Sequence, residues 1–373
     1  MIKIDIATKV VSPDTLIWVV FPGLRRRFLN IFLANDVVFL EAPGLELNPE
    51  VVKHAALVRQ RTRLSMAVAD YVRKGDGQPP ARNPSNYSDA KLDDGPEKTL
   101  ASNIRKMFAK MKAGDLIVVP GQTFAPVHFA EIISDFSAND TIEIDRYPGE
   151  QIPVRKVRWL SQVPRAMVPS ELQVYLSKPP AAQMVPRGFQ NDQFFRLAYP
   201  SFVQAEKSAV MMEGPRYDGK HPLATHEANV LVSYFISAFN AIELNRLQQF
   251  TTLDVDQAIA AFYAPALVDS FSQNFNSPGK FGLVAFSAIM ATFVSAGIAV
   301  SLLGPSDAQL AGGIEVTNSI SPQDSHAAKS AGVKLQYLYN ALQKQEIDRL
   351  SDLADKAEKN IGLRTPMKVE VAP

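Results

Sequence analysis

Residues 112–120 read KAGDLIVVP and join a turn to a short apolar strand. Gly114 and Asp115 favour a turn, and the aliphatic run Leu116–Val119 is typical of a strand buried on both faces. Five further runs of this kind indicate strands, at residues 15–21, 36–40, 128–135, 141–146 and 153–160. Short strands at such spacing predict a small antiparallel β-barrel of the PUA or SH3-like kind, accompanied by helices.

The pattern changes beyond residues 177–187, a proline-containing segment that we take as the domain boundary. Helical patterns follow at residues 225–249, 254–275, 281–303 and 326–361. The sequence therefore predicts an α+β protein with two parts. Residues 1–186 are expected to form a β-rich sensor or binding module that contains a loop at 75–96. Residues 187–373 are expected to form an all-α bundle that serves as an effector or oligomerisation domain.

Composition narrows the class of protein. The chain has 373 residues, of which 46% are hydrophobic and 21% charged, so it can bury a sizeable core. Its 39 basic and 38 acidic residues nearly balance, so attraction to nucleic acid requires a local basic patch. The absence of cysteine excludes disulfides and thiolate metal sites. The first residues lack the features of a signal peptide, and we expect a cytoplasmic protein.

Residue sets typical of catalysis or of metal binding are not found in the sequence. His221 and His226 are five positions apart, which places them on different helix faces, and Pro222 between them favours a loop. Gly312-Gly313 precedes no Lys-Ser/Thr pair, so a phosphate loop of the Walker type is absent. We therefore expect no catalytic residue, metal or cofactor. An enzyme with an unfamiliar site remains a third class of hypothesis.

Four motifs together resemble the N-terminal module of bacterial Mrr-like restriction proteins, over about residues 14–186. They are the helical residues Asn103–Phe108, the strand at 112–120, the strand Arg155–Leu160 and the turn Val163-Pro164-Arg165. The resemblance implies a sensor or targeting module, fused to a variable effector and used against invading DNA. The nuclease of that family needs an Asp, and then a Glu or Gln two residues before a Lys, in order to hold a metal ion. No such set is found after residue 190.

Three successive arginines, Arg25, Arg26 and Arg27, follow the Pro22-Gly23 turn at the start of a predicted helix. Guanidinium groups and helix N-termini both favour anions, so these residues are candidates for gripping a phosphate. The alternative is a solvated helix face.

A second candidate site lies on the strand at 153–160. Alternation along the strand places Arg155 and Trp159 on one face and Arg158 on the other. A tryptophan beside arginine can stack on a flipped or single-stranded base. The alternative is that Trp159 belongs to the core and packs against Trp18. The expected ligand of the module is nucleic acid or a nucleotide.

Residues 281–303 carry no charge and are numerous enough to cross a bilayer as a helix. The small residues Ser287, Ala291, Ser295 and Ala299 recur every four positions and form one smooth face. In lipid such a face lets helices approach closely, and in water it suits a helix buried at the centre of a bundle. Both locations, the inner membrane and a helical bundle, remain open at this point.

The leading hypothesis is a bacterial defence-type protein. Its barrel senses nucleic acid or a nucleotide-like ligand, and its helical half forms a homo-oligomer and inserts into a membrane. The second hypothesis is a soluble, non-catalytic scaffold or DNA-binding subunit of a restriction-like system, in which the helical half is a dimerisation bundle. Other proteins of the same defence system are expected partners in either case.

Overall fold

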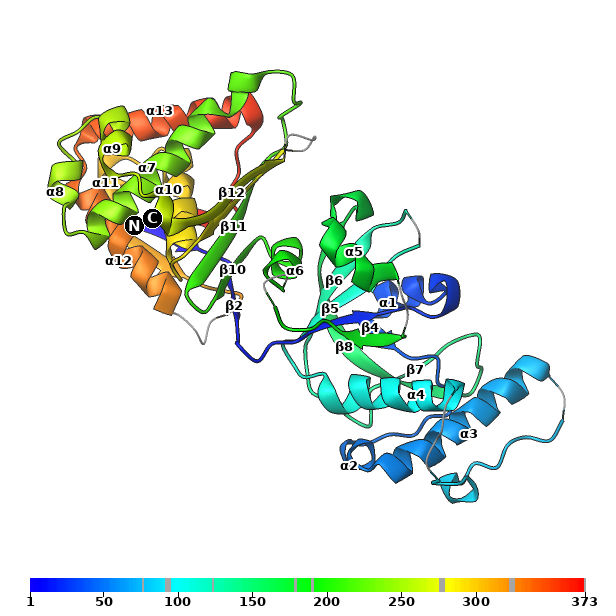
Figure 1. Cartoon of the computed structure of the whole chain (residues 1–373). Helices are drawn as coiled ribbons and strands as arrows, with labels where there is room; N and C mark the ends of the chain where they lie inside the picture. The colour runs from blue at the N-terminus through cyan, green and yellow to red at the C-terminus, as the bar shows by residue number, and fades with distance from the viewer. Residues whose placement is uncertain are drawn as a thin grey trace. The chain divides into compact units, whose positions relative to one another are not determined.

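The computed structural model describes residues 1–75, 77–90, 95–122, 124–177, 180–188, 191–274, 279–321 and 326–371. Residue 76 and residues 91–94 of the expected loop, and Pro179 of the expected boundary segment, lie outside these ranges. Contacts divide the chain into a first unit, Asp14–Ala198, and a second unit made of Met1–Pro13 and Tyr199–Pro373 (Figure 1). Whether residues 1–186 fold alone remains a prediction.

The first unit is built on one seven-stranded sheet. Its strands are β3 (Ile17–Val20), β4 (Val37–Phe39), β5 (Leu116–Pro120), β6 (Val127–Ile132), β7 (Thr141–Glu143), β8 (Gln151–Val163) and β9 (Ala182–Met184). They follow the order β4-β8-β6-β5-β3-β9, and β7 pairs with β8 off this path. β3 and β5 are parallel and all other pairs are antiparallel.

The strands expected in this region are therefore confirmed, but the small antiparallel barrel is wrong. Parallel strands need a long crossover connection. The segment between β3 and β5 supplies it, because it contains α1 to α4. These helices are α1 (Leu29–Asn35), α2 (Pro49–Lys53), α3 (Ala55–Lys74) and α4 (Pro96–Arg105), and α4 continues as a π-helical turn, Lys106–Lys110. α5 (Ser170–Ser177) and α6 (Asn191–Ala198) complete the unit, with 3-10 turns at Leu24–Arg26, Pro84–Asn86 and Arg165–Met167.

One hydrophobic cluster joins the crossover helices to the sheet. It includes Ile104 and Phe108 from α4 with its π turn, Ile117 from β5 and Trp18 from β3. The buried indole of Trp18 donates a hydrogen bond of 2.9 Å to Oδ2 of Asp115, just before β5. This bond fixes the start of β5 beside its parallel neighbour.

The second unit contains two sheets as well as helices, so the predicted all-α bundle is wrong. A five-stranded sheet has the order β12-β13-β11-β10-β2, and a three-stranded sheet has the order β14-β1-β15. The strands are β1 (Ile2–Asp5), β2 (Lys9–Val11), β10 (Ser201–Gln204), β11 (Lys207–Gly214), β12 (Val268–Asn274), β13 (Gly279–Ala285), β14 (Ile314–Thr317) and β15 (Lys368–Val371). The helices are α7 (His226–Glu243), α8 (Leu247–Phe250), α9 (Val255–Phe262), α10 (Met290–Leu303), α11 (Asp307–Ala311), α12 (His326–Ala341) and α13 (Lys344–Ile361), with 3-10 turns at Pro222–Thr225 and Pro265–Leu267.

Two of the expected helices are divided between a strand and a helix. α9 ends at Phe262, and Ala264 is extended (φ −118°, ψ 94°) before Pro265, as residues that precede proline commonly are. β12 follows. β13 pairs with β11 on one side and β12 on the other, and most of its residues are buried. A strand in this position reads as a continuous apolar run, which periodicity alone does not distinguish from a buried helix.

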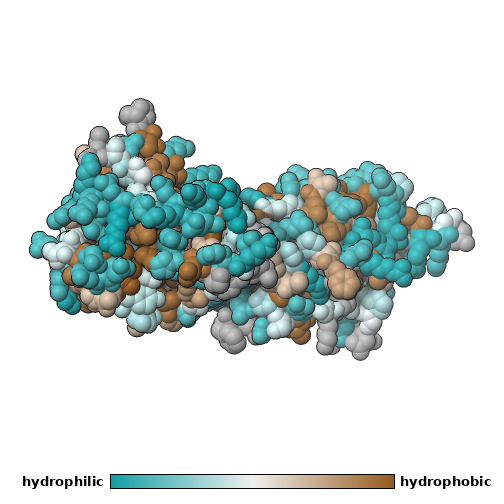
Figure 2. Space-filling model, turned by 90° about the horizontal axis from the view of Figure 1, so that it is seen from above, coloured by the Kyte–Doolittle hydropathy of each residue, from teal (hydrophilic) through white to brown (hydrophobic). Residues whose placement is uncertain are grey.

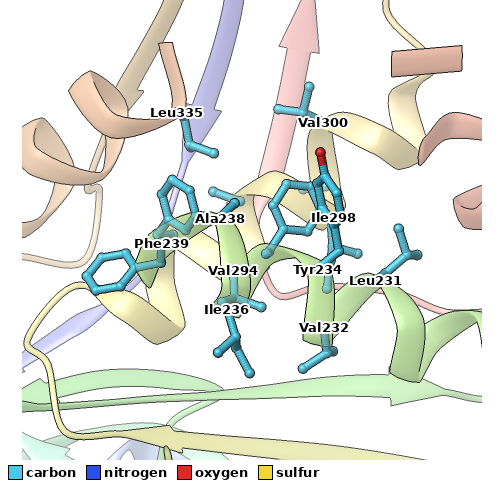
Figure 3. Packing of buried hydrophobic residues seen from close by; sticks show 14 of the residues in the cluster. Leu231, Val232, Tyr234, Ile236, Ala238, Phe239, Val294, Ile298, Val300 and Leu335 are labelled. Atoms are coloured by element: carbon cyan, nitrogen blue, oxygen red, sulfur yellow. The ribbon is translucent and has the colours of Figure 1, made fainter. Parts of the chain in front are cut away.

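The expected uncharged helix 281–303 is therefore wrong as a single element, and only α10 remains of it. Ala291, Ser295 and Ala299 are buried inside the second unit, while Ser287 precedes the helix. Figure 3 shows Val294, Ile298 and Val300 of α10 packed with Leu231, Val232, Tyr234, Ile236, Ala238 and Phe239 of α7 and Leu335 of α12. Among the described residues, no helix combines the length and the apolar character that a membrane crossing requires.

The hydropathy of the surface is consistent with burial of the apolar residues in the cores of the two units. On the face shown in Figure 2, hydrophilic side chains predominate over each unit, and hydrophobic residues gather in small separate groups. Scattered groups of this kind are ordinary for globular proteins.

Candidate anion-binding cavity

The turn after β3 has an unusual backbone. Gly23 has φ +72°, and a Cβ there would lie 2.5 Å from the Phe28 ring, so only glycine fits. Arg25 and Arg26 follow with φ 54° and 60°. A left-handed conformation costs a non-glycine residue about 1–2 kcal/mol. α1 begins at Leu29, so the three arginines lie in the turn before the helix and do not form its solvated face.

Arg25 and Arg26 border a cavity of about 530 Å³. Its other lining residues are Gly121, Gln122, Arg165, Leu176 and Ser177. Gly121 and Gln122 follow β5, Arg165 follows β8, and Ser177 ends α5. The cavity lies at the carboxyl ends of the parallel strands β3 and β5, the edge at which open sheets with parallel strands commonly bind ligands.

Three guanidinium groups converge on this cavity. Arg26 is half-buried, lies 4.4 Å from the centre of the Phe21 ring, and donates from Nε to the carbonyl of Gly121 at 3.3 Å. Burial lowers the pKa of Arg26, and the nearby charge of Arg165 lowers it further. Arg165 donates from Nη2 to Oγ of Ser177 at 3.3 Å.

No carboxylate neutralises these groups: within the described ranges, Arg25, Arg26 and Arg165 form no ion pair with Asp or Glu. An anion in the cavity would relieve the repulsion between Arg26 and Arg165.

Arg27 does not line the cavity. Its Nη1 lies 3.7 Å from Oε1 of Glu41, and its Nε donates to the carbonyl of Leu24 at 3.2 Å. The turn therefore separates the three arginines into two that border the cavity and one that is paired elsewhere.

An exposed aromatic ring lies on the connection between β5 and β6. Phe124 is 95% exposed, two positions after the lining residue Gln122. The connection is closed by hydrogen bonds from the Gly121 amide to the Pro126 carbonyl (3.0 Å) and from the Ala125 amide to the Gln122 carbonyl (2.8 Å). A fully exposed phenylalanine is costly in water and offers a flat apolar face to a base.

Arg155, Arg158 and Trp159, the candidate site residues on β8, do not line the arginine cavity. Arg155 is only 1% exposed and donates to the carbonyls of Met107, Met111 and Ser134, at 2.9, 2.7 and 2.8 Å. Burial lowers the pKa of Arg155. Its guanidinium is thus occupied by the protein backbone and has no face for a ligand.

Arg158 and Trp159 also lie away from the cavity. Arg158 is exposed and lies 3.5 Å from Oε2 of the buried Glu131. Trp159 is half-buried against the core cluster of the first unit, with its ring edge-on to His128 at 6.1 Å. The structure therefore does not bring these residues together with Arg25 and Arg26.

The sequence pattern predicts no role for the lining residue Arg165 or for Phe124 on the nearby β5–β6 connection. Arg165 belongs to the Val163-Pro164-Arg165 turn, which enters the sequence analysis only through the family resemblance. Phe124 stands in a turn, where a single aromatic residue is a weak signal. The position of Arg165 beside the ends of β3 and β5 follows from strand pairing between distant segments, and the sequence pattern does not report it.

No protein-family model, curated protein or solved structure matches this chain. The resemblance to Mrr-like modules consequently depends on the four motifs alone. Two of these motifs border the cavity, since the 112–120 strand leads into Gly121 and the last motif ends at Arg165.

Proposed function

We propose that the first unit binds a phosphate-bearing ligand, nucleic acid or a nucleotide, in the cavity of Arg25, Arg26 and Arg165. The single observation that carries this proposal is the convergence of three arginines, without a carboxylate partner among the described residues, on a cavity whose lining residue Gln122 is two positions before the exposed Phe124. Structural arginines normally donate hydrogen bonds to protein groups. Arg26 donates one such bond and Arg165 another, so most guanidinium donors of the three arginines remain available.

The arginines and Phe124 are proposed to contact different parts of the ligand. Guanidinium forks donate paired hydrogen bonds to phosphate oxygens, and they retain their charge at any physiological pH. Arg26 is held in place by the Phe21 ring and the Gly121 carbonyl, which reduces the entropy lost on binding. Phe124 supplies a stacking surface for a base, a contact that tolerates any base sequence.

For the whole chain we propose a non-catalytic nucleic-acid-binding subunit of a bacterial defence or restriction-like system. The Mrr-like motifs support this context, and the enclosure of α10 in the second unit favours it over an effector that enters a membrane. The second unit then serves oligomerisation or contact with other proteins of the system.

The proposal is tested by fluorescence anisotropy with a labelled single-stranded oligonucleotide and by titration with a nucleoside diphosphate. Arg26→Gln removes a charge-assisted contact, which is equivalent to about 1.5–3 kcal/mol or roughly ten- to hundredfold in affinity. Arg27→Gln removes the same charge from the same turn but outside the cavity, and it should bind nearly as well as the natural protein. Equal losses in both variants would contradict the proposed site.

A further inference from the structure

A second basic region of the first unit lies between α3 and α4. A hollow of about 260 Å³ is lined by five cationic side chains and by no acidic one. The five are Arg59, Lys98, Arg105, Lys106 and Lys110. Such a concentration is notable in a chain whose formal net charge is only +1. It is the local patch that a nearly neutral protein needs in order to attract a polyanion.

The π-helical turn Lys106–Lys110 sets the positions of two of these lysines. The Met111 amide donates to the Lys106 carbonyl at 3.1 Å, five residues back, and Arg155 donates to the carbonyls of Met107 and Met111. π turns inside helices are frequent at functional sites. Arg155 therefore acts as a positioning residue, because it anchors this turn to β8.

The lysines of the π turn are not neutralised by acidic groups. Arg105, Lys106 and Lys110 have no ion pair with Asp or Glu in the part of the chain that the structure describes. Burial lowers the pKa of Lys106, and the neighbouring charge of Lys110 lowers it further. Excess positive charge of this kind favours occupation by phosphate groups.

Hydrogen bonds at the start of β9 lead from the hollow toward the arginine cavity. The Lys106 ammonium donates to the carbonyl of Ala182 at 3.3 Å. The preceding residue, Ala181, accepts at 2.9 Å from the amide of Phe21, and the ring of Phe21 lies under Arg26. Two successive residues thus connect Lys106 to the residue that supports the cavity.

We propose that the hollow and the cavity form one track for the sugar–phosphate backbone of a single-stranded nucleic acid. This inference rests on the proposed function and makes it more specific, because the ligand becomes a strand and not a free nucleotide. Proteins that bind single strands combine a positively charged groove with exposed aromatic rings, and Phe124 is such a ring. A base can stack on Phe124 only if it is unpaired.

The experiment measures binding of the full chain to an oligonucleotide of about 16 nucleotides, over a series of salt concentrations. The test variant is Lys106→Gln with Lys110→Gln. For single strands, log K falls with log salt by about 0.7 for each neutralised phosphate. The variant should therefore reduce the slope by about 1.4 and weaken oligonucleotide binding, while nucleoside diphosphate binding stays unchanged.

The matched control is Lys53→Gln with Lys74→Gln, which removes the same charge from exposed lysines outside the hollow. An equal reduction of the slope in this control would overturn the track. An unchanged slope in the test variant would also overturn it, while loss of binding in Arg26→Gln would still support the cavity. If the natural protein binds neither oligonucleotide nor diphosphate, the proposed function itself fails. Binding to phosphatidylglycerol vesicles in place of the oligonucleotide would overturn the inference.

Discussion

The middle of β8 and the turn after β3 both carry arginines, and the surroundings of these arginines are opposite. Arg155 on β8 is 1% exposed and its guanidinium meets three backbone carbonyls. Arg26 in the turn is half-buried and donates to one carbonyl while it lies on an aromatic ring. Arg155 uses its donors to hold the protein together, and Arg26 keeps donors available for a ligand.

This comparison separates structural from binding arginines on physical grounds. A buried cation is retained only if its donors are satisfied, since the cost of removing it from water must be offset. A partly buried cation that has unused donors and lies next to a second cation is less stable without a ligand than with a bound anion. Burial and donor use together thus indicate function better than the presence of arginine in a motif.

The largest expected effect is on Arg155. Arg155→Met leaves two buried carbonyls and one half-buried carbonyl without their donor, at about 1 kcal/mol or more each. We expect the free energy of unfolding to fall by about 3 kcal/mol in urea titrations. Arg158→Met on the same strand removes the exposed member of an ion pair with Glu131, 3.5 Å away, and should cost less, about 1 kcal/mol. Similar losses of unfolding free energy in the two variants would contradict the structural role of Arg155.

A smaller loss of stability is expected when a larger side chain is introduced where α10 packs against α7. A Cβ on Gly297 would lie 2.4 Å from the ring of Phe235 in α7. Gly297→Val should therefore destabilise the protein by about 1–3 kcal/mol through overpacking. Val333→Leu, at a position that is 71% exposed on α12, is the control and should change the melting temperature little. A stable Gly297→Val protein would contradict the packing of α10 against α7.

The smallest effect concerns strain in the turn. Arg25→Gly relieves a left-handed conformation that costs about 1–2 kcal/mol, and loses about 0.5–1 kcal/mol to the greater freedom of glycine. We expect a net stabilisation of about 0.5 kcal/mol, together with weaker oligonucleotide binding. Arg27 has φ −61°, so Arg27→Gly should destabilise slightly and leave binding intact. A destabilised Arg25→Gly protein would show that the turn is not strained.

The sequence predicts the strands of the first unit well, because their side-chain patterns are local. β5 is an uninterrupted aliphatic run and β8 alternates. The prediction for the second unit is wrong because β13 lies between two strands and is mostly buried. Its apolar run therefore continues into that of α10 and has the pattern of a single helix. Membership of Met1–Pro13 in the second unit depends on pairing such as that of Ile2 with Ile314, which no local pattern records.

The candidate site was predicted only in part for the same reason. The sequence predicts Arg25 and Arg26 as site residues because they are adjacent in a turn. Arg165 and Phe124 come from two other connections and Lys106 from the π turn after α4, and only the pairing of distant strands and the packing of α4 set their positions. Alternation along β8 correctly described which residues share a face, but it did not report that the face of Arg155 is covered by the π turn.

Photo-cross-linking tests the central claim most directly. A single-stranded oligonucleotide that contains 5-iodouracil is bound to the full chain and irradiated, and the linked peptides are identified by mass spectrometry. If bases stack on Phe124 at the arginine cavity, the principal cross-link falls on the peptide that contains Phe124. Phe124→Leu should then abolish that cross-link. Cross-links confined to the second unit, or undiminished in Phe124→Leu, would contradict the account.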